Sequence, residues 1–178
     1  MIVIEAKNLV KTYNGNTVVK GINLAIEKGI VFGFLGPNGA GKTTTLEMIE
    51  GLRKPSQGEI FINGLNTATN MQEIKSIIGV QLQSSVLDDR IKVEEAIQLF
   101  ASFYTKTLPV EYLLELTDLK EKRNSLQKKL SGGQKQRLAL ALCLVNDPEI
   151  IFLDEPTTGL DPQSRRNLWR APMSVLPP

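Results

Sequence analysis

Residues suited to phosphate chemistry gather near the start of the chain. The segment Gly36-Pro-Asn-Gly-Ala-Gly41-Lys42-Thr43 fits the pattern G-x-x-x-x-G-K-[ST]. Backbone N–H groups of such a loop cradle phosphates, its lysine reaches the β- and γ-phosphates, and its hydroxyl holds magnesium. The segment therefore predicts a nucleotide site with Mg²⁺. The residues expected to contact the nucleotide are Gly36, Pro37, Asn38, Gly39, Ala40, Gly41, Lys42, Thr43 and Thr44.

A pair of acids in the second half of the chain could complete this chemistry. Asp154 and Glu155 follow the apolar run 150–153, which predicts a buried parallel strand. Ligands of open α/β sheets bind at the carboxyl ends of strands. We therefore expect Asp154 to hold Mg²⁺ and Glu155 to orient or deprotonate the water that attacks the γ-phosphate. By itself, an Asp-Glu pair after an apolar run is more often a solvated strand end. The phosphate loop upstream makes a role in metal binding and catalysis the favoured interpretation.

The flanks of the loop predict the elements that position it. The apolar run 29–35 predicts a strand buried on both faces. A helix is expected from Lys42, with Leu46 and Ile49 on its inward face and Gly51 as its stop. The N-terminus of that helix would point partial positive charge at the phosphates.

A second glycine-rich segment, Leu130-Ser-Gly-Gly-Gln134, allows two readings that can both hold. Its S-x-x-Q spacing is a capping box, and residues 138–145 of the helix that it opens are apolar on every side. A helix start with two glycines and a hydroxyl is also an anion site. We expect Ser131, Gly132, Gly133 and Gln134 to receive the nucleotide of another subunit.

The two glycine-rich motifs with the Asp-Glu strand end resemble the nucleotide-binding subunit of an ATP-binding-cassette (ABC) transporter, over about residues 4–170. In that family two subunits sandwich two ATP molecules, each phosphate loop facing the other subunit's Leu-Ser-Gly-Gly-Gln segment. The resemblance implies that Ser131 and Gly133 contact the partner's γ-phosphate.

Three further residues take a role only through this resemblance. Tyr13 matches the aromatic residue that stacks on adenine, although by itself it is equally an ordinary strand aromatic. Gln83 matches the glutamine that touches Mg²⁺, and without the family it is a polar residue at a strand end. Asp161 matches the acidic loop at the subunit interface, although Asp-Pro alone predicts a turn.

The phosphate loop 36–43, together with segments 81–90 and 99–104, most closely resembles the drug or multidrug exporter branch of the family. That branch implies a second ABC subunit, as a homodimer or heterodimer, and a separate membrane permease. The chain would then be cytoplasmic, at the inner face of the membrane.

Two alternative functions remain open. One is a non-transport ABC ATPase, a class that usually carries coiled coils, zinc-ligating cysteines or a tandem cassette. The other is a fragment that binds ATP with little turnover.

Composition is consistent with one α/β domain that works beside a membrane. The chain has 178 residues, 42% hydrophobic and 22% charged, and its net charge of +2 gives no reason to expect nucleic acid. Its apolar runs reach about eight residues, against the roughly 20 that span a bilayer. No signal peptide pattern opens the chain.

Cys143 is expected as a buried hydrophobe in a reducing cytoplasm. The basic stretch 120–129 is expected to be a solvated linker.

The chain is therefore expected to form a phosphate-loop α/β core with a flanking antiparallel sheet and a helical insert. Strands are predicted near 3–9, 17–26 and 58–64, and helices near 93–103 and 110–116. As one ABC domain it would divide into the β-subdomain and phosphate-loop core (1–83), the helical subdomain (84–130), the signature helix with the acid strand and interface loop (131–170) and an irregular tail (171–178).

The last residues depart from the family pattern. Prolines interrupt the segment after Arg170, and the family's last strand, its histidine and its final helices have no counterpart. The sequence contains no histidine. We therefore expect a shortened cassette, from a truncated gene, a frameshift or a designed fragment, that binds ATP but hydrolyses it slowly.

Overall fold

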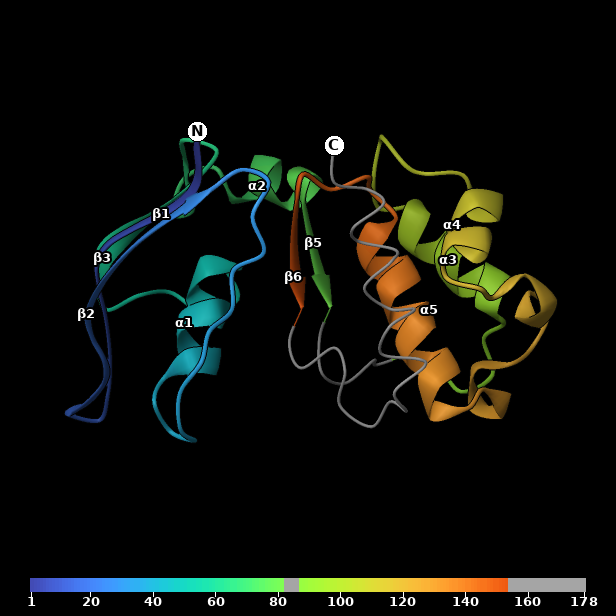
Figure 1. The fold of residues 1–178 in the computed structure, drawn as a ribbon, viewed down its shortest axis with the longest axis horizontal. Helices are drawn as coiled ribbons and strands as arrows, with labels where there is room; N and C mark the ends of the chain where they lie inside the picture. Colours follow the sequence, from blue (N-terminus) through green and yellow to red (C-terminus); the bar gives the residue numbers. More distant parts are fainter. Residues whose placement is uncertain (82–86, 154–178) are drawn as a thin grey trace. The chain divides into compact units, whose positions relative to one another are not determined.

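The backbone divides into two compact units. The computed structural model describes residues 1–81 and 87–153. One unit comprises Met1–Lys75 and the other begins at Ser76. Figure 1 shows strands and helices in both, in keeping with the expected α/β class. The subdomain boundaries expected from the sequence stay a prediction.

An antiparallel sheet forms most of the first unit. Its strands are β1 (Ile2–Tyr13), β2 (Asn16–Glu27), β3 (Gln57–Ile62) and β4 (Leu65–Asn66), in the order β2-β1-β3-β4. All three pairings are antiparallel, which confirms the strands predicted near 3–9, 17–26 and 58–64. Alternating residues enter the core because successive side chains of a strand point to opposite faces. The fully buried ones include Leu9, Ile60 and Ile62.

The helix that follows the phosphate loop is α1 (Lys42–Ile49). It begins at the predicted residue, and Gly51 follows it with a positive φ of 76°, the conformation typical of a helix stop. Its buried face is formed by Thr45, Met48 and Ile49. Leu46, predicted to lie on that face, is only partly buried. The predicted helix is therefore confirmed, with its inward face rotated slightly.

The strand predicted for residues 29–35 is not formed. These residues have neither helical nor strand structure, and Val31 and Leu35 are 69% and 96% exposed. A strand requires a neighbouring ladder of hydrogen bonds, and none of the strand pairings among the described residues includes this segment. The prediction of a strand buried on both faces was wrong because it inferred pairing from hydrophobicity alone.

A parallel strand pair and a buried helix organise the second unit. Strands β5 (Ile78–Gln81) and β6 (Ile150–Leu153) pair in parallel, with Gln81 opposite Leu153. Strand β6 has the predicted bounds. Helix α2 (Met71–Ile77), which the sequence did not predict, leads directly into β5. Helix α5 (Gly132–Leu144) packs against β5, and Figure 1 shows the two side by side.

Two short helices complete the core around α5. They are α3 (Val93–Ala101) and α4 (Val110–Leu116), which confirms both predicted helices. Their apolar faces share one core cluster with α5, in which Ile97, Leu114 and Leu144 are fully buried. Helix α5 contacts β5 as well as these helices, which is consistent with residues 138–144 being apolar on every side. Cys143 is buried within it, as predicted.

The basic stretch between α4 and α5 is not a solvated linker. It contains the 3₁₀ turns η1 (Lys120–Lys122) and η2 (Gln127–Lys129). Arg123 pairs with Glu94 of α3 at 3.0 Å and with Glu111 of α4 at 3.0 Å. Backbone N–H groups at the start of α3 donate to carbonyls of this stretch. Lys120, Lys128 and Lys129 are exposed, as predicted. The prediction failed for Arg123, because the acids that pair with it lie elsewhere in the sequence.

Among the described residues, no helix has both the length and the apolar character needed to cross a lipid bilayer.

The contact between β5 and α5 generates a stability prediction. A β-carbon on Gly79 would lie 2.2 Å from the carbonyl oxygen of Cys143. We expect Gly79→Ala to lower the free energy of unfolding by about 1–3 kcal/mol, since the strand and helix must separate to accept it. Gly132→Ala is the control, because no atom lies within 4 Å of its added β-carbon. Urea unfolding measures both, and equal midpoints would contradict the close packing described here.

Candidate functional site

The phosphate loop is an exposed turn that leads directly into α1. Gly39 and Gly41 adopt positive φ angles of 80° and 84°, which residues with a β-carbon rarely occupy. At Gly41 a β-carbon would also lie 3.0 Å from the carbonyl oxygen of Val18 on β2. Glycine is therefore required at this position both by backbone conformation and by the approach of β2.

Helix α1 begins without a cap of its own. Its N-cap residue is Gly41, which has no side chain to accept a hydrogen bond, and its first turn contains no acidic residue. The first N–H groups of an α-helix have no partner within the helix. They carry the positive end of the helix dipole, so an anion at this position is stabilised. The local structure is thus suited to a phosphate group.

Lys42 places a cation at the same loop. Its ammonium nitrogen donates to the carbonyl oxygens of Gly36 at 2.7 Å and Pro37 at 2.9 Å. The loop is further closed by the Ala40 N–H, which donates to the Pro37 carbonyl at 3.2 Å. Lys42, the first residue of the uncapped helix, therefore places its ammonium within the same eight-residue segment, as the sequence pattern predicts.

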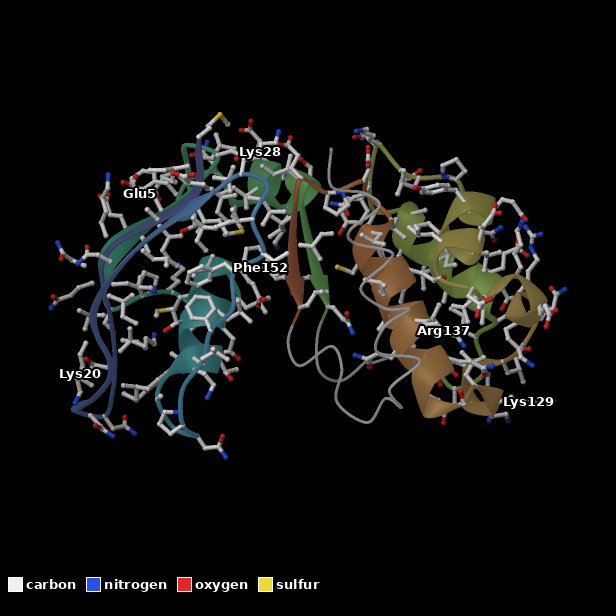
Figure 2. All side chains as sticks on the ribbon, viewed as in Figure 1. Glu5, Lys20, Lys28, Lys129, Arg137 and Phe152 are labelled. Atoms are coloured by element: carbon white, nitrogen blue, oxygen red, sulfur yellow. The ribbon has the colours of Figure 1, made fainter. Side chains whose placement is uncertain are left out.

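The second predicted anion site, at the start of α5, differs because this helix caps itself. The N–H of Gln134 donates to the Ser131 hydroxyl oxygen at 3.3 Å, and the N–H of Ser131 donates to Oε1 of Gln134 at 3.0 Å. This is the predicted capping box. Ser131 and Gly132 remain exposed, as does Lys129 just before them (Figure 2). The helix start is therefore accessible to a ligand as well as internally stabilised.

Tyr13 lies at the end of β1, in a tight hairpin. Asn14 and Gly15 both have positive φ, 46° and 81°, as a two-residue hairpin turn requires. Two cations lie near the Tyr13 ring: the Lys11 ammonium is 5.1 Å and the Arg53 guanidinium carbon 5.5 Å from its centroid. Sequence reasoning missed both, and no motif marks Arg53.

Arg53 is held in place by α1. Its Nε donates to a carboxylate oxygen of Glu47 at 2.6 Å, and its backbone N–H donates to the Glu47 carbonyl at 3.0 Å. The side-chain hydrogen bond with Glu47 raises the pKa of the Arg53 guanidinium. The tyrosine at the end of β1 is therefore connected, through Arg53, to the helix that carries the phosphate loop.

The remaining predicted site residues, Gln83, Asp154, Glu155 and Asp161, lie outside the described residues. The strands that precede the first three are described: β5 ends two residues before Gln83, and β6 ends immediately before Asp154. These strands are adjacent and parallel, so their carboxyl ends lie at one edge.

One of the three predicted Mg²⁺ ligands is described. Thr43 is exposed in the first turn of α1, next to Lys42. A hydroxyl oxygen is a hard donor of the kind that Mg²⁺ accepts, so the residue fits the ion. Within the part of the chain that the structure describes, no three His, Cys, Asp or Glu side chains gather in a way that could hold a metal.

Comparison with known proteins decides the family. The profile of the ABC transporter family matches residues 19–158, a span that contains both glycine-rich motifs and the acid pair. The chain belongs to the ABC transporter family.

Curated relatives of the chain are named as export ATP-binding proteins. The chain is 40% identical to a Nod factor export ATP-binding protein I of Burkholderia orbicola (strain AU 1054), over 97% of this chain and 59% of the relative. It is 38% identical to a protein of the same name from Ralstonia nicotianae, over 98% of this chain and 56% of the relative. The chain therefore spans somewhat over half the length of these relatives.

Solved ABC structures have the same fold. One is an ATP-binding cassette in a dimeric post-hydrolysis state bound to ADP and Pi, with a TM-score of 0.86, 29% identity and coverage of 97% of this chain and 82% of that one. Another is cbiO1 from Clostridium perfringens, part of the ABC transporter complex cbiONQ, with a TM-score of 0.84, 28% identity and coverage of 98% and 74%. The predicted ABC cassette fold is confirmed.

The capping box of α5 generates a prediction about stability alone. We expect Ser131→Ala to lower the free energy of unfolding by about 1 kcal/mol, because the Gln134 N–H loses its acceptor. Ser102→Ala is the control, since that hydroxyl donates to the carbonyl of Leu99 in its own helix. The pair Ser131→Ala and Gln134→Ala should cost less together than the sum of the two, because each bond supports the other. Strict additivity in urea unfolding would count against a reciprocal box.

Proposed function

We propose that the chain is the ATP-binding and ATP-hydrolysing part of an ABC exporter. The observation that carries the proposal is the start of α1, where a glycine N-cap, uncapped N–H groups and the Lys42 ammonium come together in one exposed loop. A triphosphate supplies the negative charge that this arrangement stabilises.

The nucleotide is bound through both of its ends. The loop residues Gly36–Thr43, with Thr44, bind the phosphates through backbone N–H groups, and Lys42 leaves its loop carbonyls to contact the β- and γ-phosphates. Tyr13 stacks on the adenine base. The short path from Tyr13 through Arg53 and Glu47 to α1 supports this assignment, because it links the base site to the phosphate site.

Magnesium and water complete the reaction. Thr43, Gln83 and Asp154 would hold Mg²⁺, which neutralises the charge that develops on the phosphates. Glu155 holds the attacking water and accepts its proton, while the N–H groups of α1 and the Lys42 ammonium stabilise the leaving phosphate charge. The meeting of the carboxyl ends of β5 and β6 supports this set, because Gln83 and Asp154 follow those two strands.

A second ABC subunit, in a homodimer or heterodimer, completes each ATP site in this proposal. Ser131, Gly132, Gly133 and Gln134 contact the γ-phosphate of the ATP bound by the partner, and Asp161 lies at the subunit interface. The exposure of Ser131 at the start of α5 supports the role. A solved ABC cassette similar to this chain is dimeric with ADP and Pi bound, which further supports it.

The proposed assembly also includes an integral membrane permease on the inner face of the cell membrane, with this chain on the cytoplasmic side. Relatives about 40% identical are named for export, which favours export over import. No observation favours a non-transport ABC ATPase, or a fragment that binds ATP without turnover, over this reading.

Nucleotide binding is tested by thermal unfolding with Mg-ATP. At about 100 times Kd, the ligand should add roughly 2.7 kcal/mol to the free energy of unfolding. We expect Lys42→Ala to remove most of this gain, because the loop loses its cation at the phosphates. Lys20→Ala, an exposed residue of β2 (Figure 2), is the control and should keep the full gain. An equal shift in Lys42→Ala and the unmodified chain would refute the assignment.

Pairing of two subunits is tested by light scattering. With Mg-ATP present and not consumed, mass action should favour a dimer, because each ATP is bound by both copies. Replacing Gly133 by a bulky residue, in Gly133→Leu, should keep ATP binding at the phosphate loop and abolish the dimer. A monomer at high protein concentration with and without Mg-ATP would contradict the shared site.

A further inference from the structure

The proposed function assigns Tyr13 a role but does not say what holds its ring in place. Tyr13 is the last residue of β1 and is followed directly by a two-residue turn. A cation within about 6 Å of a ring centroid is attracted by the face of the ring. Arg53 meets this condition at 5.5 Å.

Arg53 is itself unusually well fixed for a partly exposed arginine. Both its side chain and its backbone N–H bond to Glu47, at 2.6 and 3.0 Å. The residues that follow it are joined to β1: the Ser56 N–H donates to the Val10 carbonyl at 2.8 Å, and the Thr12 N–H donates to the Ser56 hydroxyl at 3.1 Å. The guanidinium is therefore held between α1 and the strand that carries Tyr13.

Lys11 lies near the ring but does not link it to α1. Its ammonium also lies 5.1 Å from the ring centroid, but its bond at 2.6 Å is to the carbonyl of Lys54, in the exposed segment after Arg53. Lys11 thus helps to attach that segment to β1. Of these two cations, Arg53 is the one whose side chain connects the ring to α1.

We infer that Arg53, held by Glu47, is a positioning residue that keeps the Tyr13 ring in place to receive the nucleobase and couples the base site to the phosphate-loop helix. The inference rests on the proposed function, since it needs Tyr13 to stack on adenine. Arg53 itself touches neither the base nor the phosphates in this scheme.

The test compares two ligands that share phosphates but differ in the base. Calorimetry measures Kd for Mg-ATP and for magnesium tripolyphosphate, and their ratio reports the contribution of the nucleoside. Partial unfolding of a variant scales both constants equally and leaves the ratio unchanged, so destabilisation is not mistaken for the expected effect. A merely structural role of Arg53 would leave the ratio where it is in the unmodified chain.

Arg53→Met is expected to reduce the preference for ATP roughly 2- to 5-fold, the range that an exposed cation–π contact supplies. Glu47→Ala should do the same, because it releases the guanidinium. Arg53→Lys should also lose the preference, since one ammonium cannot bind Glu47 and cover the ring together. Lys54→Met is the matched control, because it removes a neighbouring exposed charge with no ring contact.

The double variant separates the inference from the proposed function. Tyr13→Ala should reduce the ATP preference by about 5-fold or more, since stacking on a base is lost. Adding Arg53→Met to it should cause no further change. If Tyr13→Ala has no effect, the proposed stacking is wrong. If Tyr13→Ala acts but Arg53→Met leaves the ratio unchanged, weakens tripolyphosphate equally, or acts additively with Tyr13→Ala, the positioning role alone is overturned.

Discussion

The unsatisfied N–H groups at the start of α1 are the constraint from which the site follows. The chain must pass from the loop into the helix with a left-handed residue, close to the Val18 carbonyl of β2, and only glycine fits there. A glycine cannot cap the helix, so the helix start remains open. Lys42 adds a cation to the same place. A phosphate at this position would accept hydrogen bonds from the N–H groups that the helix itself leaves without a partner.

The first N–H groups of helix α5, unlike those of α1, find acceptors within their own segment. Ser131 and Gln134 satisfy its first N–H groups reciprocally, so this helix start is stable without a ligand. Its glycines leave the surface open. The second half of α5 is largely buried and contacts β5 and the helices α3 and α4, so the exposed end is attached to a packed core. The start of α1 therefore has no side-chain cap, whereas the start of α5 is capped by its own residues.

Prediction from the sequence succeeded where the signals were local. The bounds of α4 and β6 were predicted correctly, because apolar periodicity and flanking turn residues define both ends. The same reasoning failed for residues 29–35, where apolar character was taken as evidence for pairing with neighbouring strands. It failed again for the basic stretch, because the partners of Arg123 are Glu94 and Glu111 in other helices.

The sequence by itself determined the chemistry of the site: the phosphate loop, the self-capped helix start and the family. These depend on backbone conformations and spacings within a few residues, which residue types specify directly. Only the tertiary structure decided which side chains surround Tyr13. Lys11 reaches a carbonyl 43 positions away, and Arg53 bridges β1 and α1. Such contacts depend on how separate elements pack, and no local pattern of residues encodes that geometry.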